Sequence, residues 1–449
     1  MAIRIIHTAE PLSDPAVRAV RDALRAGGLT AGGDRIDVPA IVRQIVRDVQ
    51  EQGDQALIEL TRRLDRATLS PDRIRLSPDE IQQAHRSADA DFLALMARVA
   101  DNIRRYQESI LLRDPPELVR GGRRLGVRYT PIDRVGVYVP GGRALYPSTV
   151  LMTVVPAQVA GAGEIALVSP PTTDGDVNPM VLALAGMLGI DEVYRIGGAQ
   201  AVAALAMGTP TVRAVEKIVG PGNAFVAEAK RQLFGRVGID SVAGPSEVLI
   251  VADETAQPAH LAADLLAQAE HDPGSAVLVT PSADLARSVA EELERQLPAL
   301  ERSQAARAAL DAYSAILVVS DLEAACDVAN DFAAEHLQVI VRDEDAALAR
   351  IRHAGAIFVG PWTPVPLGDY FAGPSHVLPT GGTARFFGPL SCNDFLKASS
   401  LLRYDQASLA EDAADVVDFA TREGLTAHAR AVAIRTQPGN PQSAIRNPQ

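Results

Sequence analysis

Polar residues that can bind a metal ion or move protons recur at several places in the second half of the chain. Gln268 and His271 lie in a helical stretch that begins at Pro258, and a spacing of three puts both on one helix face, where they could grip one ion. Imidazole suits zinc, whereas an amide oxygen is a weaker ligand. Such a pair more often belongs to a solvated helix face, so the pair alone is weak evidence for a metal site.

An adjacent acid and histidine, Glu335 and His336, stand between a helical stretch at 323–334 and an apolar strand that begins at Leu337. Two neighbouring titratable groups of this kind suit general acid–base chemistry. The plainer interpretation is a polar helix end, where a histidine interacts favourably with the helix dipole.

A loop rich in Gly, Pro, Asp and His follows the apolar stretch GAIFVGPW, and it includes Gly368–Tyr370 and Gly373–His376. Such a loop after a buried strand indicates a functional site, with Asp369 among its polar side chains. Glu423 and His428 lie in the C-terminal helical segment, where exposure to solvent is the default expectation.

Three glycine-bearing turns follow expected strands: Pro140–Gly142, Gly197–Gln200 and Gly220–Asn223. Ligands of open α/β sheets sit outside the carboxyl ends of the strands, where glycine lets the backbone approach a ligand and a helix N-terminus favours phosphate. The dinucleotide fingerprint G-x-G-x-x-G is absent, because Phe225 stands where the third glycine would be. Any one turn reads as an ordinary connection, but three in one lobe indicate a nucleotide site.

The elements around these residues alternate in a way that predicts parallel sheets. Helical spacing dominates residues 10–110, four strand–helix pairs follow over 135–234, and a second series runs from 247 to 360. We expect an α/β fold with two doubly wound Rossmann-like lobes, one inserted in the other. The expected divisions are an N-terminal helical segment packing with the second lobe (1–134), a nucleotide-binding Rossmann-like lobe (135–245), a second αβ lobe with the metal and acid–base residues (246–385) and a small helical C-terminal tail domain (386–449).

Composition narrows the class of protein. A chain of 449 residues is too long for one hydrophobic core, and its formal net charge of −13 disfavours nucleic acid and anionic lipid as partners. Cys326 and Cys392 are too few for a disulfide framework, and Met1–Pro11 lacks an apolar signal segment. We therefore expect a cytoplasmic protein that binds neither nucleic acid nor membrane. The residues alone leave a metal-dependent hydrolase and a dehydrogenase both open.

Taken together, the distinctive segments resemble the histidinol dehydrogenase family, in order and across most of the chain. The segments that carry the resemblance are VGVYVPGG (135–142), PSTVLMTVVPAQVAG (147–161), RIGGAQAVAALA (195–206), IVGPGNAFVAEAKR (218–231), AGPSEVLIVAD (243–253), ADLLAQAEHDP (263–273), AEHLQ (334–338) and LGDYFAGPSHVLPTGGTAR (367–385), with Glu423 and His428 beyond them.

The resemblance implies a role for each matching position. The implied zinc ligands are Gln268, His271, Asp369 and His428, and the implied acid–base pair is Glu335 and His336. The lobe at 135–245 becomes the NAD-binding lobe, with Tyr138, Gln200 and Asn223 as NAD contacts. The implied substrate contacts are Ser246, Gln268, His271, His336, Asp369, Glu423 and His428.

The implied reaction is the oxidation of L-histidinol to L-histidine through the aldehyde, with one zinc per subunit and two NAD, as the last step of histidine biosynthesis. The family resemblance further implies a homodimer in which the C-terminal tail crosses to the partner, so that His428 and Glu423 complete the neighbour's site. Small departures from the family pattern occur at Asp240–Val242, at Ser375, where the family usually has Asn, and over 384–395.

Three other functions would make different use of the same residues. A paralogous zinc- and NAD-dependent dehydrogenase could act on another small polyol or a sulfonated alcohol, but Glu423 and Ser246 favour histidinol, since a carboxylate pairs with the amine of a cationic substrate. A zinc hydrolase without a nucleotide would leave Tyr138, Gln200 and Asn223 without a role. A catalytically silent binding protein would not need the pair Glu335–His336.

Overall fold

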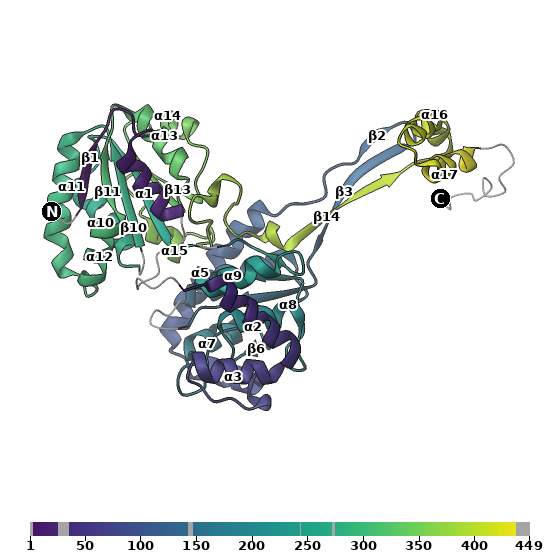
Figure 1. The fold of residues 1–449 in the computed structure, drawn as a ribbon, viewed down its shortest axis with the longest axis horizontal. Helices are drawn as coiled ribbons and strands as arrows, with labels where there is room; N and C mark the ends of the chain where they lie inside the picture. The colour runs from purple at the N-terminus through teal and green to yellow at the C-terminus, as the bar shows by residue number, and fades with distance from the viewer. Residues whose placement is uncertain (1–2, 26–35, 142–146, 243, 272–273, 437–449) are drawn as a thin grey trace. The chain divides into compact units, whose positions relative to one another are not determined.

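The computed structural model describes residues 3–25, 36–141, 147–242, 244–271 and 274–436. The chain forms two compact units, Met1–Leu111 with Ile132–Phe395, and Leu112–Pro131 with Leu396–Gln449 (Figure 1). The first unit holds the two expected lobes. Among the described residues, no helix combines the length and the apolar character that crossing a membrane requires.

The first lobe is a five-stranded parallel sheet in the order β6-β5-β4-β7-β8. Its central strands read as unbroken apolar runs because helices cover both faces. The chain reverses its direction of winding between β4 and β7, which makes their carboxyl ends the ligand-binding edge expected of such a sheet. The strands are β4 (Arg134–Tyr138), β5 (Glu164–Val168), β6 (Val193–Tyr194), β7 (Lys217–Val219) and β8 (Gly238–Ile239); the helices are α6 (Pro147–Ala160), α7 (Pro179–Met187), α8 (Gly198–Met207) and α9 (Ala224–Leu233).

The second lobe is a six-stranded parallel sheet in the order β1-β11-β10-β9-β12-β13. Because β1 precedes the first lobe in the chain and pairs with β11, the first lobe is inserted in the second, and the predicted fold class is confirmed. The strands are β1 (Arg4–His7), β9 (Ser246–Ala252), β10 (Gly274–Thr280), β11 (Ala315–Val318), β12 (His336–Ile340) and β13 (Ala356–Val359); the helices are α10 (Pro258–Ala269), α11 (Ala283–Gln296), α12 (Ser303–Tyr313), α13 (Leu322–Phe332), α14 (Glu344–Arg350) and α15 (Val365–Tyr370).

The N-terminal helices divide between the lobes, and the expectation that the whole segment packs with the second lobe is wrong beyond α1 (Pro15–Arg25). Helix α1 adds to the core under the second sheet, whereas α2 (Val38–Gln52) and α3 (Asp54–Leu64) pack on α8, α4 (Pro78–Ser87) on α7, and α5 (Ala90–Ile110) on α6. The physical reason is that α7 and α8 are apolar on nearly all sides and need cover on their outer faces. Short 3-10 turns complete this unit: η1 (Pro71–Arg73), η2 (Leu297–Ala299), η3 (Thr383–Arg385) and η4 (Cys392–Phe395).

The second unit combines two distant stretches of chain. Strands β2 (Leu118–Arg120), β3 (Arg123–Pro131) and β14 (Leu396–Arg403) form an antiparallel sheet in the order β14-β3-β2, followed by α16 (Gln406–Arg422) and α17 (Thr426–Thr436). Arg123 of β3 bonds Asp412 and Glu411 of α16. The expectation of a purely helical segment after residue 386 is therefore wrong for β14, because its partner strand lies far away in sequence and local pattern does not reveal such pairing.

Candidate active site

The predicted acid–base pair lies at the amino-terminal edge of the second sheet. Helix α13 ends at Ala333, whose left-handed backbone (φ 51°) turns the chain into β12, so His336 is the first residue of that strand. Glu335 is only 7% exposed and His336 only 4%. The interpretation as a polar helix end therefore fails, because a solvated helix end would leave both side chains in water.

The parallel pairing of β9 with β12 brings Ser246 and Glu247 against this pair. Glu335 Oε2 accepts hydrogen bonds from Ser246 Oγ at 2.5 Å and from the Glu247 backbone N–H at 3.1 Å. In return, Glu247 Oε1 accepts from the Glu335 N–H at 3.2 Å and from the Gly381 N–H at 2.8 Å. Two carboxyl groups thus cross-link the starts of the two strands.

Burial has the largest effect on the pKa values of Glu247 and Glu335. Burial, together with the negative charge of Glu335, raises the pKa of Glu247 to about 8, so Glu247 is protonated at neutral pH. Burial also raises the pKa of Glu335, although His336 and the hydrogen bond from Ser246 act in the opposite direction. A carboxylate with a raised pKa is a better proton acceptor near neutral pH than an ordinary glutamate.

The imidazole of His336 has one polar neighbour at each of its nitrogens. Its Nδ1 lies 3.2 Å from the backbone oxygen of Glu247, and its Nε2 lies 3.4 Å from Asp369 Oδ1, without the geometry of a hydrogen bond. Donation from Nδ1 leaves the Nε2 lone pair as the proton acceptor. Burial alone would lower the pKa of His336, but the carboxylates of Glu335 and Asp369 raise it to about 9, so they stabilise the imidazolium form. The neutral imidazole, with its Nε2 lone pair, is the form that accepts a proton.

Asp369 belongs to the short helix α15 rather than to the loop that the sequence predicts. This helix lies against Phe358 of β13, and a Cβ at Gly368 would come within 2.7 Å of Phe358 Cε1, so the absence of a side chain there permits the close approach. Phe358 in turn packs against the ring of His336, with the ring centroids 5.9 Å apart. The glycine therefore fixes where Asp369 meets the histidine.

Gln268 and His271 come together through a turn, not on one helix face. Helix α10 ends at Ala269, and Pro273 in the sequence disfavours its continuation. His271 Nδ1 lies 3.2 Å from the backbone oxygen of Gln268. Gly274, which pairs with Ser246, packs closely on the carbonyl groups of this turn, so the turn lies beside the start of β9.

The donors in this region fit zinc in kind. Gln268 is 3% exposed and its amide Nε2 has no hydrogen-bond partner among the described residues, which is unusual for a buried polar side chain. An amide, an imidazole and a carboxylate are nitrogen and oxygen donors of the sort that zinc accepts. Within the described ranges, however, no three His, Cys, Asp or Glu side chains converge as a metal-binding group.

Glu423 and His428 belong to the second unit. Glu423 is the residue at which α16 ends, and His428 lies in the first turn of α17. Both are exposed.

The glycine turns of the first lobe converge at the carboxyl edge of its sheet. Gly141 and Gly197 both pack so tightly on Pro170 that a Cβ at either position would collide with it, and Gly220 packs in the same way on the backbone of Tyr138. The Tyr138 hydroxyl accepts a hydrogen bond from the Gly198 N–H at 3.0 Å. The turn at Gly142 lies outside the described residues.

Two of the predicted nucleotide contacts differ in how they are held. Gln200 is 1% exposed, and neither its amide oxygen nor its amide nitrogen has a partner among the described residues. Asn223 caps helix α9, and its side-chain oxygen accepts from the N–H groups of Phe225 and Val226. The side chain of Gln200 therefore has unused hydrogen-bonding atoms that a ligand could fill. The side-chain oxygen of Asn223 is already used to cap helix α9.

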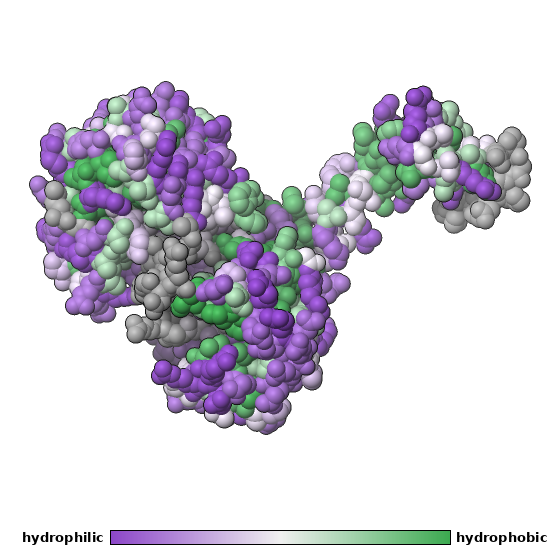
Figure 2. Space-filling view, viewed as in Figure 1, coloured by the Kyte–Doolittle hydropathy of each residue, from purple (hydrophilic) through white to green (hydrophobic). Residues whose placement is uncertain are grey.

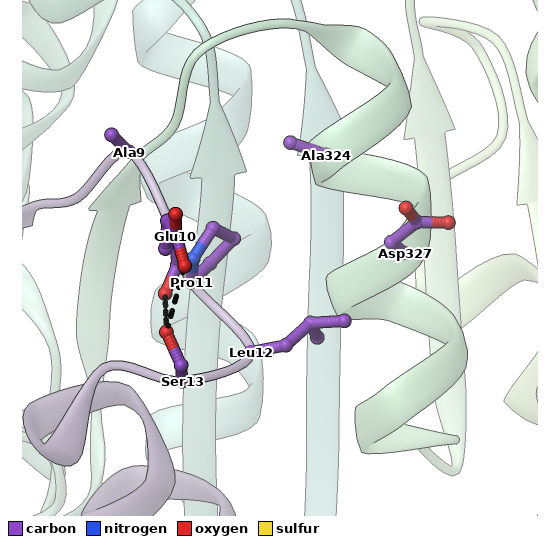
Figure 3. A pocket seen from close by; sticks show the side chains of 7 residues that line it. All are labelled: Ala9, Glu10, Pro11, Leu12, Ser13, Ala324 and Asp327. Carbon is purple, nitrogen blue, oxygen red and sulfur yellow. Dashed lines mark hydrogen bonds between the residues drawn. The ribbon is translucent and has the colours of Figure 1, made fainter.

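A surface hollow of about 300 Å³ lies elsewhere on the second lobe, where residues 9–13, which follow β1, face α13 (Figure 3). Ser13 and Glu10 bond each other there, while Asp327 points from α13. Residues after β1 and at the start of α13 lie at the carboxyl edge of the sheet, opposite the edge that carries His336. The hollow is thus no part of the candidate active site.

Comparison with known proteins decides the family. A sequence model described as histidinol dehydrogenase matches residues 31–436. This chain belongs to the histidinol dehydrogenase family. It is 52% identical over 397 residues to the histidinol dehydrogenase of Rhodopirellula baltica, covering 88% of this chain and 86% of that protein, and 48% identical over 395 residues to that of Bacillus subtilis, covering 88% and 92%.

The fold agrees with this membership. The crystal structure of histidinol dehydrogenase from Elizabethkingia anophelis superposes with a TM-score of 0.88 at 33% identity, covering 97% of this chain and 98% of that one. As a member of the histidinol dehydrogenase family, the chain is an oxidoreductase.

One departure from the histidinol dehydrogenase pattern has a structural explanation. Ser375 is buried, donates from Oγ to the Met152 carbonyl at 3.1 Å and accepts from the Val377 N–H at 3.2 Å. The serine therefore ties the loop after α15 to helix α6, which links the two lobes. Another departure, Asp240, accepts from the Gly220 N–H at 2.7 Å and pairs with buried Lys230, so it supports the third glycine turn.

Sequence reasoning missed Glu247. The signal was a single acid in the otherwise apolar strand SEVLIVA, because a buried charged residue is rare without a partner.

We predict that Glu247→Gln removes a pH-dependent part of the protein's stability. The folded pKa of about 8 exceeds the ordinary value of 4.5, so this carboxyl stabilises the fold fully below pH 4.5 and loses that contribution as the pH rises through 8. Wild-type protein should lose at least roughly 2–4 °C of melting temperature over this window for this reason, and the variant should lose less. Glu254→Gln, an exposed carboxylate paired with Arg342, is the control. Parallel pH profiles for Glu247→Gln and the wild type would contradict the assignment.

Proposed function

We propose that this protein is a zinc-dependent, NAD-linked histidinol dehydrogenase that oxidises L-histidinol to L-histidine through the aldehyde, using two NAD, as the last step of histidine biosynthesis. The observation that carries the proposal is the buried pair of Glu335 and His336, with the half-buried Asp369 beside it, in a member of this family. A buried acid next to a buried histidine provides one proton acceptor for each of two successive oxidations.

His336 serves the first oxidation. Its Nε2 takes the proton from the substrate hydroxyl, while the carbon that bears this hydroxyl loses a hydride, which bound NAD would accept; the product is the aldehyde. The hydrogen bond from Nδ1 to the Glu247 backbone oxygen holds the ring so that Nε2 faces the substrate. The carboxylates of Glu335 and Asp369 stabilise the resulting imidazolium.

Glu335 serves the second oxidation. Its carboxylate takes a proton from water, which adds to the aldehyde carbon, and the hydrated form then loses the second hydride to give the acid. Ser246 and the Glu247 N–H orient the carboxylate through hydrogen bonds to Oε2, which leaves the other oxygen free for the water. Ser246 also contacts the substrate in this proposal.

Zinc would be held by Gln268, His271, Asp369 and His428, and when bound it supplies a positive charge that fixes the amine and imidazole of the substrate. Gln268 is buried, and the ring of His271 lies within one turn of it, so the two side chains can serve one site. Residues Gln268, His271, His336, Asp369, Glu423 and His428 then line the substrate together with Ser246.

NAD would bind at the carboxyl edge of the first lobe, with Tyr138, Gln200 and Asn223 as contacts, and when bound it accepts the hydride. Gln200 supports this placement, because its buried amide lacks partners for both the oxygen and the nitrogen. The N-terminus of α8 next to Gly198, and that of α9 next to Asn223, offer N–H groups to a pyrophosphate.

The C-terminal unit supports assembly as a homodimer in which the tail completes the neighbouring site. Helix α16 buries only Ser408 and Ala413, and α17 only Ala429. Large apolar side chains remain exposed on this unit: Leu401, Leu402, Val416, Phe419, Leu425 and Ile434. Figure 2 shows green, hydrophobic surface on the face of the unit that it displays. A small helical unit with little core of its own needs a further surface to cover it. Exchange of a terminal element between identical chains supplies one.

We predict that the two half-reactions separate in single variants. Wild-type protein should form two NADH for each L-histidinol, with histidine as the product. His336→Asn should lose roughly 10²–10⁴-fold in alcohol oxidation, while Glu335→Gln should impair oxidation of the aldehyde more than that of the alcohol. Stopped-flow absorbance of NADH with either substrate makes the comparison. One NADH with free aldehyde accumulating, or equal losses in both half-reactions, would refute the division of roles.

We predict that activity depends on zinc held by the assigned residues. Removal of the metal with a chelator should abolish turnover, and added zinc should restore it. His271→Ala and Asp369→Ala should each lower the zinc content measured by elemental analysis, whereas His353→Ala, a histidine outside the cluster, should not. Full zinc content in both site variants would show that the ligands lie elsewhere.

We predict that mixing two nearly inactive variants restores activity if the tail crosses. In a mixed dimer of His336→Asn with His428→Ala, one site carries both lesions and the other carries neither. Free subunit exchange at equal amounts should therefore return about a quarter of wild-type activity. If the tail serves its own chain, every site keeps one lesion and no activity returns. A mixture of His336→Asn with Glu335→Gln is the control, because both lesions lie in the first unit and each site of a mixed dimer keeps one.

A further inference from the structure

Helix α3 carries a row of side chains that points at helix α8 of the first lobe. Leu57, Thr61 and Asp65 follow at intervals of four, which places them on one face. Leu57 is fully buried and packs in the same apolar cluster as Ala199 at the start of α8. Asp54, at the start of α3, bonds Thr209 and Thr211 just beyond the end of α8, so the other end of α3, at Asp65, lies toward the start of α8 and the turn that holds Gln200.

The polar members of this row lack partners. Thr61 is fully buried, yet its Oγ1 makes no hydrogen bond with any described residue, and the buried Oδ2 of Asp65 likewise has none. A threonine inside a helix ordinarily bonds a carbonyl one turn earlier. Together with the two free amide atoms of Gln200, four buried polar atoms in this region have no partner in the described part of the chain. Buried polar groups are nearly always paired, so this concentration indicates a missing ligand.

Asp65 sits where a carboxylate brings no benefit to the fold. It ends helix α3, and the negative end of the helix dipole disfavours an acid there. The next residue, Arg66, adopts a left-handed backbone (φ 59°), which is uncommon for a residue with a side chain and fixes the path of the chain at this point. Burial raises the pKa of Asp65 to about 6, which an unpaired carboxyl group requires.

The end of α3 that carries Asp65 lies toward the predicted nucleotide contacts, because α3 packs on α8 with its first residue beside the far end of that helix. Burial raises the pKa of Tyr138 to about 12, and the negative charge of Asp65 contributes to that shift. The Tyr138 hydroxyl in turn bonds the Gly198 N–H, and Gly198 adjoins the side chain of Gln200. Asp65, Tyr138 and Gln200 thus border one region at the carboxyl edge of the sheet.

We propose that Asp65, supported by Thr61, accepts hydrogen bonds from the vicinal hydroxyls of the adenosine ribose of NAD and so excludes the 2′-phosphate of NADP. Among side chains, a carboxylate suits this task, because it accepts two hydroxyl donors and repels a phosphate at the same position. The inference rests on the proposed NAD-linked function and deepens it by naming the residue that selects the cofactor.

The test compares NAD with NADP. Wild-type protein and Asp65→Asn are examined for binding of NADH and NADPH by fluorescence and for kcat/KM with L-histidinol and each oxidised cofactor. We expect Asp65→Asn to weaken NADH binding roughly 10- to 100-fold, to strengthen NADPH binding, and to shift kcat/KM in the same sense through KM. Asp65→Glu, which keeps the charge, should retain part of the preference for NAD. Glu59→Gln, an exposed carboxylate on the same helix paired with Arg62, is the control and should change neither constant.

The possible results distinguish a folding defect, a failure of this inference and a failure of the proposed function. Asp65→Asn should melt no lower than wild type, because it replaces a carboxylate whose buried Oδ2 has no partner among the described residues. A loss of binding in a well-folded variant is then a contact effect. Equal weakening of both cofactors would assign Asp65 to another part of the dinucleotide and overturn the proposal, and so would unchanged binding. If wild-type protein neither binds NADH nor oxidises histidinol with NAD, the proposed function itself fails. A wild type that does both, with an unaltered preference in Asp65→Asn, defeats only this inference.

Discussion

The side-by-side pairing of β9 with β12 is the constraint on which the candidate active site depends. It is an ordinary contact between two buried parallel strands, yet it sets Ser246 and Glu247 against Glu335 and His336 within hydrogen-bond reach. A shift of one residue in register would turn each of these side chains to the other face of the sheet. The register of these two buried strands therefore fixes which side chains meet for the proton chemistry.

The strand order around β9 in the second lobe matches that around β4 in the first lobe, but the two lobes place their polar residues at different edges. In the first lobe, the glycine turns and Gln200 lie at the carboxyl edge, where open α/β sheets usually bind ligands. In the second lobe, Glu335 and His336 lie at the amino edge. A common fold thus does not assign the position of a site; the position follows from which loop carries the reactive side chains.

Much of this arrangement was predictable from the sequence, and the exceptions share a physical cause. Alternating strands and helices predict the fold, and the pair Glu335–His336 stands out by residue type. The roles of Glu247 and Asp65 are harder to predict, because each depends on one buried carboxylate oxygen without a partner among the described residues, which arises only when distant segments pack. Likewise β14 pairs with β3, more than 250 positions earlier, and no local pattern reports such a contact. At the end of α10 a local pattern was misleading instead. The spacing of Gln268 and His271 predicts that both lie on one helix face, but the helix ends at Ala269 and His271 lies in the turn that follows.

The discontinuous C-terminal unit limits how the protein can be dissected. Its sheet takes β2 and β3 from the middle of the chain and β14 from near the end, so no single cut releases the unit as an intact piece. Shortening the chain before Leu396 would strip β3 of its partner along eight paired positions. The exposed ribbon edge would then offer free N–H and C=O groups to other chains, and the shortened protein would be prone to aggregate. Gene fusions and trimmed expression variants must therefore keep both stretches together.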